Sequence, residues 1–128
     1  MLLTGRIILY CAAALIALGG LYDVFVPKLP ANLAAMCGGE ERQRRLVREL
    51  LRALGGSLVA VGAAVALLVN GMGPQNRPRT LAAILLLVLP AEGTNSFCMY
   101  RVGSPFYVPL SFALLTVVGV LVAWVGAS

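Results

Sequence analysis

Four stretches of this 128-residue chain are apolar over the length that a helix needs to cross a lipid bilayer. Such a helix takes about 20 predominantly apolar residues. The candidate spans cover residues 5–26, 40–70, 80–100 and 104–127, with prolines, glycines and turn residues between them. The sequence therefore predicts an all-α integral membrane protein, a four-transmembrane-helix bundle that forms a single membrane domain over residues 1–128.

A secretory signal peptide is a competing interpretation of the first span, with Arg6 before the apolar run and Ala17-Leu18-Gly19 as a small-residue cleavage site. The apolar run continues past that cleavage site as far as Tyr22. We therefore interpret the first span as a transmembrane helix, ended by Pro27.

The composition favours the membrane class and excludes several kinds of function. Only 12% of the residues are charged, about half the fraction that is usual in soluble domains. The net charge of +5 comes from basic residues beside the apolar spans, where they meet anionic lipid, so we expect a lipid bilayer and no nucleic acid as a partner. Histidine, the commonest metal ligand and general base, does not occur in the sequence, and we predict no metal site, cofactor or catalytic residue.

The second span begins with a basic third, which we interpret as a cytoplasmic extension of the second helix. Its basic residues are Arg42, Arg44, Arg45, Arg48 and Arg52, and no charge follows from residue 53 to 69. Arg42, Arg44 and Arg45 are candidates for contacts with lipid headgroups or an acidic partner, although ordinary topogenic charge is the simpler explanation. Just before this span, residues 29–37 are predicted to lie as a short segment in the membrane interface.

The distribution of positive charge predicts the orientation in the membrane. The side with the first and third loops carries seven basic residues, against three on the other side. The seven are Lys28, Arg42, Arg44, Arg45, Arg48, Arg52 and Arg101, and the three are Arg6, Arg77 and Arg79. Because positive charge stays in the cytoplasm, we expect the first and third loops there and both termini on the opposite side.

Two stripes of small residues predict where helices approach closely. Gly56, Ala60 and Ala64 recur on one side of the second span, and Gly119 and Ala123 on one side of the fourth. Small side chains let helix backbones come together within a membrane. We expect these stripes to pack inside the bundle, with self-association as the alternative.

The third span carries polar residues within an otherwise apolar run. Glu92 and Asn95 share one helix face, and a carboxylate that faces lipid is costly, so Glu92 should point into the bundle. The predicted topology places these two residues in one membrane layer, together with Asp23, Arg48, Arg52 and Arg101. We expect an intramembrane ion pair between Glu92 and either Arg48 or Arg52, and a second ion pair between Asp23 and the remaining arginine. We consider three roles for this polar cluster, in decreasing order of preference. They are ion pairs that stabilise the bundle, a ligand pocket and a catalytic site.

One part of the chain resembles a known family. Glu49, followed by the Gly55–Gly56 pair and by Gly62, is similar to the start of the second helix in the DoxX-like superfamily of small four-helix membrane proteins. The Gly/Pro/Arg loop at Gly71–Arg79 before a leucine-rich third helix is similar as well, and the resemblance extends from about residue 48 to 89. It implies a four-helix bundle and an accessory role beside membrane redox enzymes.

Three functions of different classes follow from these observations. The first is a non-enzymatic accessory subunit that packs against a larger membrane complex, with a membrane protein or a second copy of the chain as its partner. The second is a protein that binds or transports a small lipophilic or charged molecule in a polar pocket around Glu92. The third and least favoured is a membrane enzyme with Glu92 as general base.

Overall fold

The computed structural model describes residues 2–126 and contains five helices in that range. They are α1 (Leu2–Phe25), α2 (Ala31–Met36), α3 (Glu41–Asn70), α4 (Arg77–Arg101) and α5 (Tyr107–Val125). The four longer helices are each long and apolar enough to cross a membrane, as the sequence predicts. The predicted end of the fourth span at residue 127 lies outside the described residues.

Three helix starts differ from the prediction by more than one residue: α1 begins at Leu2, three residues ahead of the predicted residue 5, and the starts of α4 and α5 differ for local reasons. α4 begins at Arg77, ahead of the predicted residue 80, because Pro78 occupies the first turn, where its missing N–H costs nothing. α5 begins at Tyr107 instead of residue 104, because the chain first turns through Gly103, whose φ is +69°. Positive φ angles of this kind are readily adopted by glycine.

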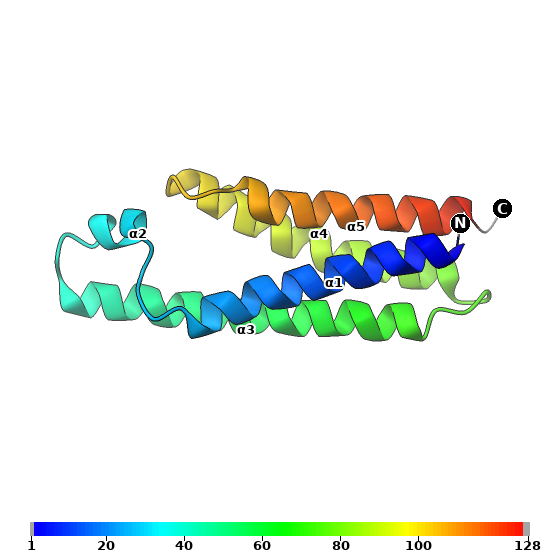
Figure 1. Ribbon diagram of the computed structural model, residues 1–128, viewed down its shortest axis with the longest axis horizontal. Coiled ribbons are helices and arrows are strands. Elements are labelled where there is room, and N and C mark those ends of the chain that lie inside the picture. The colour runs from blue at the N-terminus through cyan, green and yellow to red at the C-terminus, as the bar shows by residue number, and fades with distance from the viewer. Residues whose placement is uncertain (1, 127–128) are drawn as a thin grey trace.

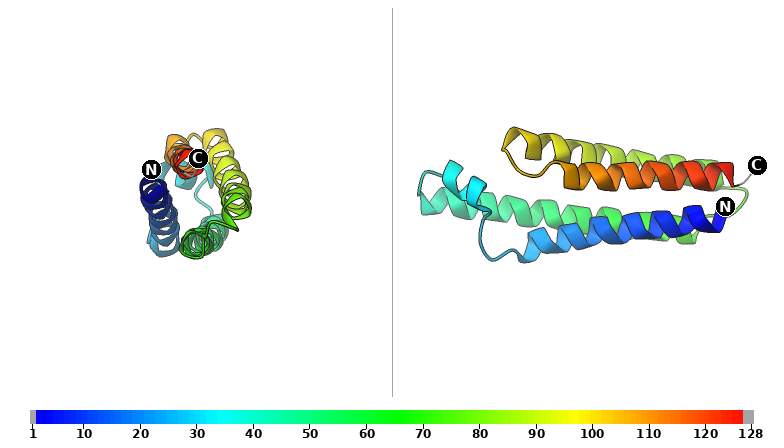
Figure 2. Two further views of the ribbon diagram at one scale, coloured as in Figure 1. Left: turned by 90° about the vertical axis from the view of Figure 1, so that its right-hand side faces the viewer. Right: turned by 45° about the horizontal axis from the view of Figure 1, so that its top comes forward.

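The long helices form an antiparallel bundle in which α1 begins and α5 ends at the same end (Figure 1). α1 packs most extensively against α3 and then against α5, and α4 packs against α5. Seen along the bundle axis, the helices follow one another in the order α3, α1, α5 and α4 (Figure 2). The contact between α3 and α4 is the least extensive of these four, so this side of the bundle is the most loosely closed.

The interior is filled by aliphatic side chains from all four long helices. Leu9, Val65 and Ile84 are completely buried, as is Val88. The outward faces are apolar too: Leu67 is 72% exposed and Leu86 is 75% exposed. In water such faces would be unstable, whereas in a bilayer they contact lipid tails.

The close contact between α1 and α3 is made by glycines other than the predicted ones. A Cβ atom on Gly55 would collide with the carbonyl oxygen of Gly20, and one on Gly62 would lie 2.6 Å from the carbonyl oxygen of Ala13. The predicted stripe does not contribute to this interface, since Gly56 has open space around it, Ala60 is exposed and Ala64 is half-buried beside α4. Gly55 and Gly62 are seven residues apart and so lie on one face, and this face is rotated by about 100° from that of Gly56.

The other predicted stripe lies inside the bundle, between α5 and α1. A Cβ atom on Gly119 would lie 2.9 Å from a methyl carbon of Leu9, and Ala123 is fully buried. A Cβ atom on Gly5 would come 2.5 Å from the backbone nitrogen of Ala123. Small residues on both helices therefore allow α1 and α5 to approach closely.

Candidate functional site

The inner face of α4 turns from apolar to polar halfway along the helix. Ile84 and Val88 are fully buried, and one turn further on Glu92 is only 1% exposed. Asn95 and Ser96 continue the same face, each 8% exposed. Because these positions are three or four residues apart, a single rotation of α4 points all of them inward.

Neither carboxyl oxygen of Glu92 makes a hydrogen bond of good geometry among the described residues, and the side chain that interacts with it most closely is the Asn95 amide. The Asp23 carboxyl of α1 adds a weaker, longer-range electrostatic interaction with Glu92. Asn95 lies beside Glu92 on the same face of α4. The arrangement therefore places a carboxyl group and an amide together inside the bundle, while Asp23 is half-buried and lies against Gly55 of α3.

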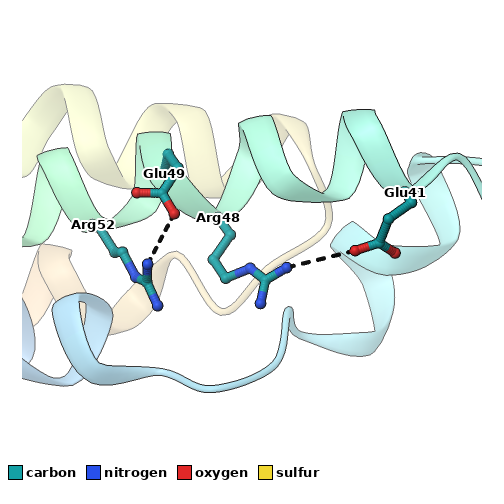
Figure 3. Close-up of polar contacts among 4 residues, drawn as sticks. All are labelled: Glu41, Arg48, Glu49 and Arg52. Carbon is teal, nitrogen blue, oxygen red and sulfur yellow. Dashed lines mark hydrogen bonds and ion pairs between the residues drawn. The ribbon is translucent and has the colours of Figure 1, made fainter.

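The predicted ion pair between Glu92 and an arginine of α3 is not formed. Arg48 instead lies 3.9 Å from Glu41, and Arg52 lies 2.8 Å from Glu49 (Figure 3). Both acids belong to α3 itself, so each arginine finds an anion without leaving its own helix. The physical reason lies in the packing: α3 is held against α1, and its contact with α4 is slight.

Arg101 is also separate from the buried acids. It is exposed at the end of α4, and its guanidinium carbon lies 6.0 Å from the centre of the Phe97 ring. At this distance a cation and an aromatic face attract each other weakly. Of the six residues of the predicted polar cluster, the structure therefore keeps Glu92 and Asn95 together on the inner face of α4, places Asp23 against Gly55 at the α1–α3 contact, and places the three arginines elsewhere.

The hydroxyl groups of Ser96 and Thr116 in the interior, unlike the Glu92 carboxyl, donate hydrogen bonds to the protein backbone. Ser96 donates a hydrogen bond of 2.9 Å to the carbonyl oxygen of Phe106, which ties α4 to the chain entering α5. Thr116 is fully buried and donates to the carbonyl oxygen of Phe112, one turn back in α5. Thr116 was not among the sequence candidates, because a threonine in an apolar helix gives no periodic signal that marks it as buried.

The basic start of α3 is divided between two faces of the helix. Arg42 and Arg45 are exposed on a face that they share with Glu40 and Glu49. Arg44 and Arg48 are half-buried and face the chain segment that follows α1. The sequence predicts that Arg42, Arg44 and Arg45 contact lipid headgroups or a partner together, whereas the structure places Arg44 on the face of Arg48.

No match to this chain was found among protein-family models, curated proteins or solved structures.

Proposed function

We propose that the protein is a non-enzymatic multi-pass membrane protein that binds a small cationic or hydrogen-bond-donating ligand between its helices, at Glu92 and Asn95. The four long apolar helices and their apolar outer faces support residence in a membrane. The excess of basic residues on the side of the first and third loops supports a cytoplasmic position for both loops. The basic start of α3 lies on this side and would be cytoplasmic too.

The observation that carries this proposal is the buried carboxyl of Glu92, which forms no ion pair and no hydrogen bond of good geometry among the described residues. A carboxylate removed from water is strongly destabilised unless a cation or hydrogen-bond donors compensate it. Within residues 2–126 the arginines that could have done so pair with other acids or lie at the surface. An ionisable residue in such a position inside a transmembrane bundle is characteristic of a binding or translocation pathway.

Thermal unfolding of the purified full chain in the presence of small cations tests this proposal. A ligand that binds only the folded state raises the unfolding temperature in a concentration-dependent way. We would compare sodium, potassium, guanidinium and propylammonium chlorides at equal ionic strength. At least one of them is expected to stabilise the native protein and to lose that effect in Glu92→Gln.

A matched variant separates binding at Glu92 from general charge effects. Glu49→Gln also removes one negative charge, but Glu49 is exposed and pairs with Arg52 on the outside of α3. The cation-dependent stabilisation should survive in Glu49→Gln. The proposal fails if all four salts act alike on the native chain, or if the specific effect persists in Glu92→Gln.

The second candidate function is an accessory subunit of a larger membrane complex, with a helix of the partner packed against this bundle. It is favoured by the resemblance to DoxX-like proteins and by the loose α3–α4 side, where Leu67, Leu68 and Leu87 border an open apolar depression. Mass spectrometry of the protein released gently from its native membrane provides the test. A stoichiometric membrane-protein partner would support this role, and a chain that emerges alone would contradict it.

A further inference from the structure

A pocket of about 340 Å³ lies between the start of α3 and the segment that connects α1 to α2. Its charged lining consists of Lys28, Arg44, Arg48 and Glu41, and Pro27 and Leu29 line its apolar part. Three cations against one acid leave the pocket with a net positive charge. Its volume lies within the range of pockets that bind small molecules.

The two arginines of this basic pocket have donor capacity that the protein does not use. The Nε atoms of Arg44 and Arg48 are both buried and without a hydrogen-bond partner. The one acid of the pocket, Glu41, is exposed and lies 3.9 Å from Arg48, at the outer limit of an ion pair (Figure 3). Planar guanidinium groups with free N–H donors match the oxygen atoms of a phosphate group.

The wall of the pocket is held in place by a contact from the far side of the bundle. Asn32 of α2 donates a hydrogen bond of 2.6 Å to the hydroxyl oxygen of Ser104, in the turn between α4 and α5. Val26, which begins the connecting segment, and Cys37, which follows α2, are buried as well. A site whose walls are already ordered loses little entropy when it binds a ligand.

The position of the pocket identifies the source of the phosphate. It begins directly after Phe25, where α1 ends, and Tyr22 and Phe25 expose large aromatic side chains beside it, at 70% and 75%. Exposed aromatic residues at the end of an apolar helix mark the level of the lipid headgroups. We propose that the basic pocket binds the phosphate of an anionic phospholipid headgroup through Arg44, Arg48 and Lys28.

Lipid titration of the purified full chain, followed by native mass spectrometry, tests this assignment. Phosphatidylglycerol and phosphatidylcholine with identical acyl chains are the probes. The native protein is expected to bind phosphatidylglycerol about tenfold more tightly, the equivalent of one charge-assisted contact. The double variant Arg44→Gln/Arg48→Gln should lose this preference.

The chain supplies a control with the same change in charge on the same helix. Arg42→Gln/Arg45→Gln removes two positive charges from the exposed face, which Glu40 and Glu49 share. This variant should keep most of the preference for phosphatidylglycerol. Equal losses in the two double variants, or no preference in the native protein, would overturn the assignment.

Two single variants keep the test decisive if the arginine variants do not fold. Glu41→Gln removes the acid of the pocket and should raise the affinity for phosphatidylglycerol about two- to fivefold, the effect of one exposed charge. Glu49→Gln, which lies outside the pocket, should change it less. Equal effects of the two variants would contradict a site at Arg44 and Arg48.

A competition experiment distinguishes the lipid from free phosphate. Inorganic phosphate is added at the same concentration as phosphatidylglycerol. It should displace little of the lipid, because it makes no contact with the apolar part at Pro27 and Leu29. Full displacement at equal concentration would show a site for a free phosphate compound and would overturn the lipid assignment.

Discussion

Glu92 places a carboxyl group in the interior of the bundle, in a position where the protein offers it no cation. The side chain is 1% exposed, and neither of its oxygen atoms makes a hydrogen bond of good geometry within the described residues, although the Asn95 amide lies close to it. Without a bound ligand, such a group opposes folding and is retained at the expense of stability. Its effect on unfolding therefore distinguishes a binding residue from a structural ion pair.

We expect Glu92→Met, which has a similar volume and no polar atoms, to increase the free energy of unfolding by about 1–3 kcal/mol. The reason is that the methionine removes a buried polar group and leaves no cavity. Denaturation in mixed micelles with sodium dodecyl sulfate, followed by circular dichroism, measures the change. A loss of about 3–5 kcal/mol would instead show that Glu92 is held in a buried ion pair.

Among the helices, the tightest association is the one between α1 and α3, where backbone meets backbone. Gly20 and Gly55 face each other so closely that neither position has room for a Cβ atom. Van der Waals packing of this kind drives helix association in membranes, where apolar surface gains nothing by leaving lipid. The adjacent glycines Gly55 and Gly56 of α3 should therefore differ in their contribution to the stability of the fold.

Gly55→Ala and Gly56→Ala make a matched pair of variants. We expect Gly55→Ala to destabilise the fold by about 1–3 kcal/mol, because the new methyl group meets the backbone of α1. Gly56→Ala should be neutral or stabilise by up to about 1 kcal/mol, since the methyl group enters open space and alanine favours the helix. Equal shifts of the unfolding midpoint in the two variants would contradict the described α1–α3 interface.

At the opposite end of the same interface, Arg6 joins the start of α1 to the end of α3. Its Nη2 atom donates to the carbonyl oxygens of Met72, at 2.6 Å, and Val69, at 3.3 Å. A hydrogen bond from a charged donor to a backbone carbonyl contributes about 1.5–3 kcal/mol to the stability of the fold. Arg6→Ala should therefore lower the thermal unfolding temperature, whereas Arg79→Ala, at an exposed position of α4, should leave it nearly unchanged.

For the whole molecule, the placement of charge along the bundle predicts its orientation. α3 extends beyond the end of α1, and its projecting part carries the arginines (Figure 1). The loop between α3 and α4 lies at the other end of the bundle (Figure 1). The excess of basic residues should keep the first of these ends in the cytoplasm.

Cysteine labelling in intact cells tests this orientation. In a variant without the native cysteines, Gln75→Cys lies in the exposed α3–α4 loop and Gln43→Cys on the exposed start of α3. A membrane-impermeable maleimide should modify Gln75→Cys directly and Gln43→Cys only after permeabilisation. The reverse pattern would place the basic end outside the cell and contradict the proposed topology.

The number, order and approximate position of the long helices could be predicted from the sequence because these properties are local. An apolar run of sufficient length forms a helix wherever its backbone cannot hydrogen-bond with water, and the prolines and glycines between the runs mark the ends. For the same reason the inward direction of Glu92 was predictable from Leu81–Ser96, since a carboxyl group within such a run avoids lipid.

The rotation of each helix about its axis, and therefore the identity of each contact, came from the packing of the bundle. Membrane helices are apolar on their outer as well as their inner faces, so periodicity does not reveal which side is buried. Adjacent residues such as Gly55 and Gly56, or Arg44 and Arg45, differ by about 100° in direction. Only the fit between helices determines which member of each pair meets a neighbour, and the same fit keeps the arginines of α3 away from Glu92.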